Sequence, residues 1–272
     1  MKQYLELLQN IMENGEEKGD RTGTGTISIF GTQTKYDLRE GFPLVTTKKV
    51  RFDAIIRELL WFIHGCTNIN DQDLTQHTPI WDAWADPDGN LGPIYGYQWR
   101  KWEKITWNEE TKGYDKTHVD QLMNLIARIK EKPTCRRLII SAWNVADIPE
   151  MRLPPCHAFM QFYVVNGRLD CQLYQRSADT ALGVPYNIAS YATLMHIIAM
   201  ECDLIPGIFT HTLGDAHLYI NHLDGIKKQL TRTPHKLPTL NIVKKPILNL
   251  TIDDFQLVGY KHDKFIKFPI AV

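Results

Sequence analysis

Cys156 is the residue in this sequence with the clearest capacity for covalent chemistry, because the local pattern predicts a hairpin whose second strand places an arginine beside it. It is followed by a run of β-forming residues, a turn dipeptide and a second strand: 158–165, Asn166-Gly167 and 169–175. Asn-Gly is typical of a two-residue type I′ hairpin turn. In that register Cys156 lies opposite Ser177 and His157 opposite Arg176, and a β-bulge would shift the pairing by one residue.

That environment favours a nucleophilic cysteine. A free thiol is mostly protonated at neutral pH, and a neighbouring cation stabilises the thiolate. The alternative is a small buried residue without chemical function. Cys156 follows Pro154-Pro155 at the end of a strand, where a ligand can approach, and its predicted neighbours are polar. We therefore favour the reactive interpretation.

Several arginines could hold a phosphate, because the planar guanidinium matches phosphate oxygens and a serine hydroxyl complements it. The candidates are Arg21, Arg136, Arg137, Arg176 and Ser177. Arg136 and Arg137 open an apolar strand, so their side chains should point to opposite faces and would rarely serve one site on one subunit. Structural salt bridges are the alternative for each arginine.

A second group is aromatic and acidic. Trp81, Trp84 and Tyr95 lie near turn residues and could form either a stacking wall for a planar ring or ordinary packing. Glu58 interrupts an otherwise apolar helix. A buried carboxyl is costly unless it is hydrogen-bonded or protonated, so Glu58 is a candidate for proton transfer, with a buried polar pair as the alternative.

A third group combines an amide with imidazoles. Asn187 precedes an apolar helix expected over 188–200, which would make it a helix N-cap. Residues 215–219 look like the entry to a further helix, in which the polar side chains of Asp215 and His217 are two residues apart. His217 and His222 lack the spacing of metal ligands on one helical face, so we predict no metal site.

The elements that must position these residues mix helices and strands without regular alternation. We expect helices over 4–11, 52–63, 119–129, 188–200 and 218–230, and strands over 24–38, 138–143, 158–165, 169–175, 239–243 and 247–258. Residues 104–116 are polar and are expected to form a surface excursion. The pattern indicates an α+β fold with a single domain over 1–272, in which helices flank a large, mostly buried β-sheet.

Composition excludes several classes of protein. The chain has 272 residues with 31 basic and 31 acidic side chains, so no net charge draws it to nucleic acid or a membrane surface. Five scattered cysteines without Cys-x-x-Cys spacing argue against a disulfide framework and fit a reducing compartment. No apolar run is long enough to span a bilayer, and the N-terminus lacks a signal-peptide pattern. We expect a cytoplasmic protein.

Taken together, the motifs closely resemble those of the thymidylate synthase family. They lie at 20–25, 58–62, 80–82, 155–157, 161–163, 172–179, 182–191, 215–219 and 269–272. They occur in the family's order along essentially the whole chain, and their combination is highly specific.

The resemblance implies a homodimer whose sheets pack back to back, with Arg136 and Arg137 donated to the partner's active site. The residues that would bind dUMP are Arg21, Arg136, Arg137, Arg176, Ser177, Asp179, Asn187, His217 and Tyr219. The residues that would line the folate site are Ile80, Trp81, Trp84, Asp179, Leu182, Gly183, Tyr186, Ala271 and Val272.

The implied reaction is reductive methylation of dUMP by 5,10-methylenetetrahydrofolate, which gives dTMP and dihydrofolate without a metal or nicotinamide. The catalytic set would be Cys156, Glu58, Tyr95, His157, Arg176 and Asn187. Cys156 thiolate would add to C6 of uracil, and Glu58, with Tyr95 and His157 nearby, would manage the proton transfers. The C-terminal residues would close over the ligands.

Three rivals stay open at this point. A pyrimidine hydroxymethylase of the same fold would finish with water instead of hydride, and one acting on cytosine would be expected to carry an acid where Asn187 stands. A hydrolase would pair Cys156 with a histidine. A non-catalytic RNA-binding role is at best secondary. Residues 104–116 look like an insertion, and Arg51 and 210–212 lie where the family varies.

Overall fold

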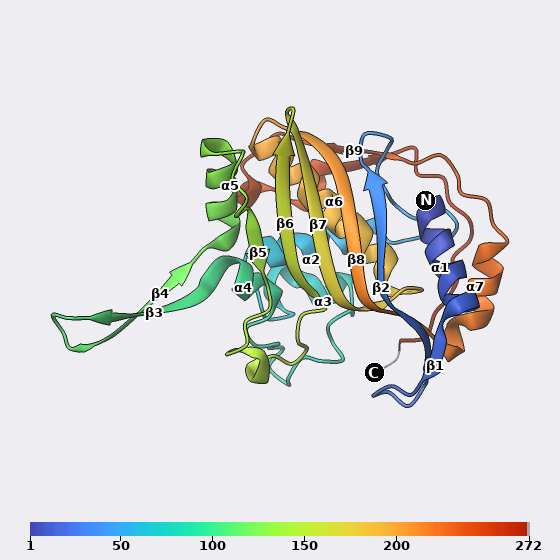
Figure 1. Ribbon diagram of the computed structural model, residues 1–272, viewed down its shortest axis with the longest axis horizontal. Helices are drawn as coiled ribbons and strands as arrows, with labels where there is room; N and C mark the ends of the chain where they lie inside the picture. Colours follow the sequence, from blue (N-terminus) through green and yellow to red (C-terminus); the bar gives the residue numbers. More distant parts are fainter. Residues whose placement is uncertain (271–272) are drawn as a thin grey trace.

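A six-stranded sheet runs through the molecule, with α2 and α6 behind it (Figure 1). The computed structural model describes residues 1–270. In spatial order the strands are β1 (Glu16–Lys18), β2 (Thr26–Asp37), β8 (Ile205–Tyr219), β7 (Arg168–Asp179), β6 (His157–Val165) and β5 (Ile139–Ser141). β7 and β8 are parallel and the other neighbours are antiparallel. A parallel pair needs a crossover connection, which α6 supplies.

Helices and short segments complete the fold. The α-helices are α1 (Lys2–Asn14), α2 (Phe52–Ile63), α3 (Leu74–His77), α4 (Tyr95–Lys101), α5 (Gln121–Glu131), α6 (Gly183–Glu201) and α7 (Leu223–Leu230). The 3₁₀ turns are Asp71–Asp73, Ile148–Glu150, Ile220–His222, Ile247–Asn249 and Ile252–Asp254. A small ribbon pairs β9 (Thr239–Ile242) with β10 (Phe255–Val258). The predicted α+β class is confirmed.

The core lies between the sheet and the two apolar helices. α6 is buried almost all round, as is α2, because both have apolar side chains on every face. Leu194 on α6 and Phe209 on β8 are fully buried in this layer. Within residues 1–270, no helix combines the length and apolar character that a membrane span needs. All five cysteines are free thiols.

Removal of a core side chain tests this layer. We expect Leu194→Ala to lower the free energy of unfolding by about 2–5 kcal/mol, because it opens a cavity where Leu194 is 0% exposed. Urea unfolding followed by circular dichroism measures the loss. Leu248→Ala is the matched control, since Leu248 is exposed, and it should cost under about 1 kcal/mol. Equal losses in the two variants would contradict this packing.

Within residues 1–270, the outer face of the sheet carries exposed aromatic side chains. Phe159, Tyr163 and Tyr174 project from it and are 39%, 59% and 40% exposed. Burial alternates along β6, so only the inner face of this strand is covered by helices.

The central hairpin matches the prediction with one shift. Asn166 and Gly167 both have positive φ, and Val165 pairs with Arg168, as a type I′ turn requires. A bulge between His157 and Phe159 moves the open end by one residue, so His157 pairs with Gln175. Arg176 N donates to the carbonyl of Cys156 at 2.9 Å, and the thiol's neighbours are those expected.

Four local predictions are wrong. Residues 247–258 do not form one strand: Ile247–Asn249 and Ile252–Asp254 are 3₁₀ turns, the second closed by a capping box between Thr251 and Asp254, and only Phe255–Val258 is a strand, β10. Residues 215–219 are the end of β8 and not a helix entry, because their polar and apolar side chains alternate with the period of a strand. α7 accordingly begins at Leu223 instead of 218. Asn187 lies inside α6 and is not its N-cap, because proline is tolerated in a first helical turn and the helix starts at Gly183.

The polar segment around 104–116 forms a β-hairpin that projects from the body of the protein (Figure 1). Its strands are β3 (Trp102–Asn108) and β4 (Gly113–Val119). Trp107 and Tyr114 pair across them with ring centroids 5.1 Å apart, and both side chains are exposed.

Candidate active site

The candidate site lies where β6 begins and where β7 and β8 end. Parallel pairing sets Ser177 beside Asp215 and Asp179 beside His217, so polar residues from two strands share one edge of the sheet. The N-terminus of α6 starts at the same edge, directly after β7. Ligand sites commonly form outside the carboxyl ends of parallel strands.

Cys156 and Arg176 meet at this edge. A guanidinium nitrogen of Arg176 lies 3.9 Å from the Cys156 Sγ. Arg176 also donates to the carbonyls of Pro155 at 2.9 Å and Pro154 at 2.7 Å, and lies over the ring of Trp143. The two prolines hold the chain extended, so that their carbonyls fix the guanidinium beside the thiol.

Two opposing effects act on the thiol. Burial raises the pKa of Cys156 above its ordinary value, and the Arg176 guanidinium opposes that shift. Burial is the larger of the two effects in the protein alone. Among residues 1–270, no imidazole or carboxylate hydrogen-bonds to Sγ, so no general base is poised to activate it.

Tyr95 links the thiol to an aromatic layer. Its hydroxyl accepts the N–H of Cys156 at 2.7 Å, and burial raises the pKa of Tyr95 well above its ordinary range. The His157 ring lies between Tyr95 and Tyr191, with centroids 5.2 and 5.4 Å away. Burial lowers the pKa of His157 to about 4, so its imidazole is neutral at physiological pH.

Glu58 on α2 is the buried acid of the site. Trp81 Nε1 donates to Glu58 Oε1 at 2.8 Å. Burial raises the pKa of Glu58 to about 7, although this hydrogen bond works in the opposite direction. Tyr95 senses the charge of Glu58, which places the two groups close together. A carboxyl with a pKa near neutrality can both accept and return a proton.

Gln175 is a site residue that the sequence reasoning missed. It is 3% exposed, and its amide nitrogen donates to Asn187 Oδ1 at 3.1 Å and to the Ser177 carbonyl at 3.0 Å. The signal was present: Gln175 occupies an inward position of β7, where Cys171 and Leu173 are apolar. A buried amide in such a position needs partners.

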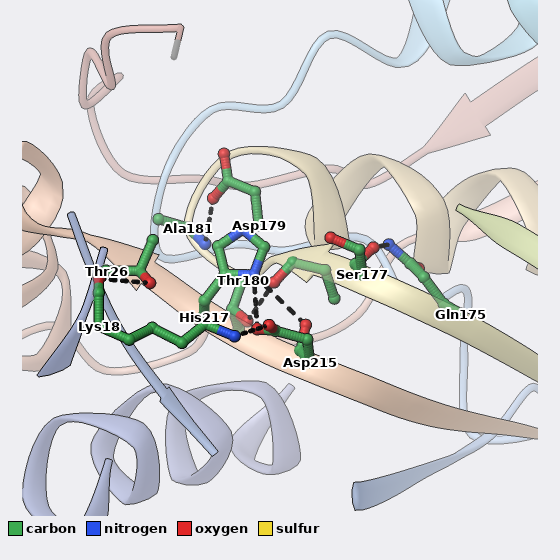
Figure 2. A network of polar contacts seen from close by, with 10 residues as sticks. Lys18, Thr26, Gln175, Ser177, Asp179, Thr180, Ala181, Asp215 and His217 are labelled. Carbon is green, nitrogen blue, oxygen red and sulfur yellow. Dashed lines mark hydrogen bonds and ion pairs between the residues drawn. The ribbon is translucent and has the colours of Figure 1, made fainter. Parts of the chain in front are cut away.

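The polar residues at the end of β8 form a connected network (Figure 2). His217 Nδ1 lies 3.1 Å from an oxygen of Asp215, and Lys18 forms an ion pair with the same carboxylate. The ring of Tyr219 packs edge-on against His217. Asp179 Oδ1 accepts the N–H groups of residues 181 and 182 and so shapes the turn into α6.

The five phosphate candidates do not all come together in one chain. Arg176 and Ser177 are adjacent on β7, and exposed Arg21 lies in the loop that leads into β2 at the same edge. Arg136 and Arg137 are exposed and lie before β5. β5 pairs with residues 159–161 of β6, and the two arginines lie beyond the far end of that pairing, more than about 10 Å from His157 along the strand.

The residues expected to line a folate site surround the entrance to α6 and the aromatic layer. Trp81 packs edge-on against Trp84 and Tyr95. Leu182, Gly183 and Tyr186 are half-buried at the start of α6, and Ile80 is exposed. Ala271 and Val272 lie outside the described residues.

Lys48 is a second residue that the sequence did not reveal. Its ammonium is almost fully buried, donates to the Ala181 carbonyl at 2.5 Å and lies over the Phe268 ring. Burial lowers the pKa of Lys48 to about 7. It therefore joins the turn before α6 to the C-terminal segment. Its position in an irregular stretch gave no periodic signal.

The comparison with known families agrees with this geometry. No group of three or more His, Cys, Asp or Glu side chains within residues 1–270 could hold a metal ion. A thymidylate synthase family model matches residues 2–272, essentially the whole chain. Members of this family are methyltransferases that act on dUMP. The chain therefore belongs to the thymidylate synthase family.

Proposed function

We propose that this protein catalyses the reductive methylation of dUMP to dTMP, with 5,10-methylenetetrahydrofolate as carbon and hydride donor and dihydrofolate as the second product. The observation that carries the proposal is the contact between Cys156 Sγ and the Arg176 guanidinium at 3.9 Å, beside the polar ends of β7 and β8. A nucleophile next to a cation that can bind phosphate suits a nucleotide substrate.

In this proposal each group at the edge has one task in binding dUMP. Arg21, Arg176 and Ser177 hold the phosphate, and the arginine fork and hydroxyl supply its donors. His217 and Tyr219 hold the ribose 3′-hydroxyl, and Asn187 reads the pyrimidine. The hydrogen-bonded network around Asp215 and His217 is present before a ligand binds, which limits the entropy lost on binding.

The thiolate of Cys156 adds to C6 of the pyrimidine and makes C5 nucleophilic. Because burial raises the pKa of Cys156, the positive charge of Arg176 must offset the desolvation of the thiolate. The proton on C5 is removed later, and Glu58, with its pKa of about 7, is the group suited to that transfer. Tyr95, which accepts the N–H of Cys156, and the neutral His157 ring beside it position the groups around the thiol.

The residues present fit a planar folate ring. Trp81 and Trp84 offer aromatic surface, and half-buried Tyr186 lies at the start of α6. Bound folate would supply a one-carbon unit and a hydride. The chain's own part is to stack the ring, exclude water and hold Glu58 through Trp81. Asp179, Leu182 and Gly183 shape the same entrance.

A continuous absorbance assay for dihydrofolate tests the proposal, with dUMP and dCMP as alternative substrates. We expect dihydrofolate to form when the substrate is dUMP and not when it is dCMP. Consumption of the pyrimidine without dihydrofolate would favour hydroxymethylation. Activity without any folate would favour a hydrolase, although no hydrogen bond joins Cys156 Sγ to a histidine within residues 1–270.

We also propose a homodimer in which the exposed outer faces of the two sheets pack together. Phe159, Tyr163 and Tyr174 give this face an apolar character that a partner would cover. Arg136 and Arg137 lie too far along the sheet to serve Cys156 of their own chain, and a second subunit would bring them to its active site.

Mixing two inactive variants tests the shared site. Cys156→Ala and the double variant Arg136→Ala/Arg137→Ala should each be inactive alone. After unfolding and joint refolding, hybrid dimers hold one intact site, so the mixture should recover about one quarter of wild-type activity. Each variant refolded by itself is the control. A monomer in sedimentation, or no recovery on mixing, would contradict the arrangement.

A further inference from the structure

Behind Asn187 lies a buried polar pair that the proposed reaction does not use. His211 on β8 is 0% exposed, and its Nε2 lies 2.9 Å from Gln175 Oε1 on the neighbouring strand β7. The ring of Phe209 stacks on the imidazole with centroids 5.3 Å apart, which limits its rotation. His211 is therefore hydrogen-bonded to the candidate site through Gln175.

The hydrogen-bond partners determine which atoms carry protons. The Ser177 carbonyl can only accept, so the nitrogen of the Gln175 amide faces it at 3.0 Å. The amide oxygen then faces His211, whose Nε2 must carry a hydrogen to donate. Nδ1 of His211 has no hydrogen-bond partner among residues 1–270, which suits the unprotonated nitrogen of a neutral ring. Burial, reinforced by His157, lowers the pKa of His211 to about 3, so the ring stays neutral at physiological pH.

The same chain of donors reaches Asn187. The second N–H of the Gln175 amide donates to Asn187 Oδ1 at 3.1 Å. If the Asn187 amide rotated by half a turn, its NH₂ would face the NH₂ of Gln175, and two donors would meet without an acceptor. The orientation of Asn187 is thus set by Gln175, whose own orientation is held by Ser177 on one side and His211 on the other.

We propose that His211 is a positioning residue that makes the site selective for uracil over cytosine. The inference rests on the proposed function, in which Asn187 reads the pyrimidine edge. Uracil presents an acceptor oxygen at C4 and a donor N3–H, whereas cytosine presents a donor amino group and an acceptor nitrogen. An Asn187 amide that cannot rotate matches uracil and opposes cytosine. Loss of the His211 donor would leave Gln175 held by the Ser177 carbonyl alone, which would weaken the constraint on Asn187.

Two variants separate this role from simple packing. His211→Leu keeps an apolar side chain in the buried position but cannot donate, whereas His211→Gln retains an NH₂ donor. Calorimetric dissociation constants for dUMP and dCMP give the preference for dUMP in each protein. We expect His211→Leu to lower that preference about tenfold to a hundredfold and His211→Gln to keep most of it. If the role were purely structural, the affinities for dUMP and dCMP would fall by the same factor, and that result would overturn the proposal.

A measurement on the unaltered protein keeps the inference testable if His211→Leu does not fold. The ¹⁵N chemical shifts of His211 should report a neutral ring protonated at Nε2, and protonation at Nδ1 would overturn the proposal. Failure of the proposed function and failure of this inference give different results. A wild-type protein that neither binds dUMP nor forms dTMP would remove the proposed function and this inference together. An active wild type whose His211→Leu variant keeps the full dUMP preference would remove the inference alone.

Discussion

Cys156→Ser should lower kcat for dTMP formation by at least about 10⁴-fold and leave the fold intact. In the proposed function the Cys156 thiol is the group that attacks the pyrimidine, and a serine hydroxyl is a far weaker acid. Neither an imidazole nor a carboxylate hydrogen-bonds to Sγ within residues 1–270, so the hydroxyl would have no base to remove its proton. Single-turnover kinetics with dUMP and folate measure the loss.

Cys66→Ser is the matched control for that experiment. Cys66 is half-buried after α2, and burial raises the pKa of its thiol to about 11, so it should be unreactive. We expect its replacement to leave kcat within about twofold of wild type, as for a substitution outside the site. A similar loss in both variants, or a Cys156→Ser protein with substantial turnover, would exclude Cys156 as the nucleophile.

Glu58→Gln should lower kcat about 10²–10⁴-fold, the usual contribution of a positioned acid or base. The amide retains the Trp81 hydrogen bond as an acceptor, so packing is conserved while proton transfer is lost. The pH profile provides a second readout. Wild-type kcat should bend near pH 7, where Glu58 titrates, and the residual activity of the variant should lack that bend. A bend that persists in Glu58→Gln would assign it to another group.

The same carboxyl predicts how stability changes with pH. Glu58 has a pKa of about 7 in the folded protein, above the ordinary 4.5, so between these values the folded state binds the extra proton. Its contribution to stability is therefore lost as the pH rises from about 4.5 to 7. The free energy of unfolding of the wild type, measured with urea and compared with that of Glu58→Gln, should fall by about 3 kcal/mol across this window. A relative stability that rises with pH would contradict the sign.

The parts of the fold that follow a single period could be predicted from sequence. α2 was predicted over 52–63 and has those bounds, because its residues are apolar all round and the helix is long. The hairpin at Asn166-Gly167 was equally readable, since the turn chemistry sets the register. The motifs named candidate site residues, and the structure brings several of them, including Cys156, Arg176 and His217, to one sheet edge.

The long strand β8 could not be predicted in the same way. It begins Ile205-Pro206-Gly207, residues that usually weaken a strand, and buried His211 interrupts its apolar face. His211 is accommodated there only because Gln175 from β7 supplies its partner, and such a pairing across strands is invisible along the chain. Lys48 escaped notice for the same reason, since its acceptor at residue 181 is far away in sequence.

The strand order has a consequence for how the protein is made. β2 pairs with β8 along its whole length, from residue 26 opposite 219 to residue 37 opposite 208. β2 is therefore synthesised long before β8, the strand with which it pairs. Long-range pairing of this kind slows folding and leaves strand edges exposed to aggregation in the meantime. Because His217 and Tyr219 lie at the end of β8, this part of the candidate site can form only after residue 219 has been translated.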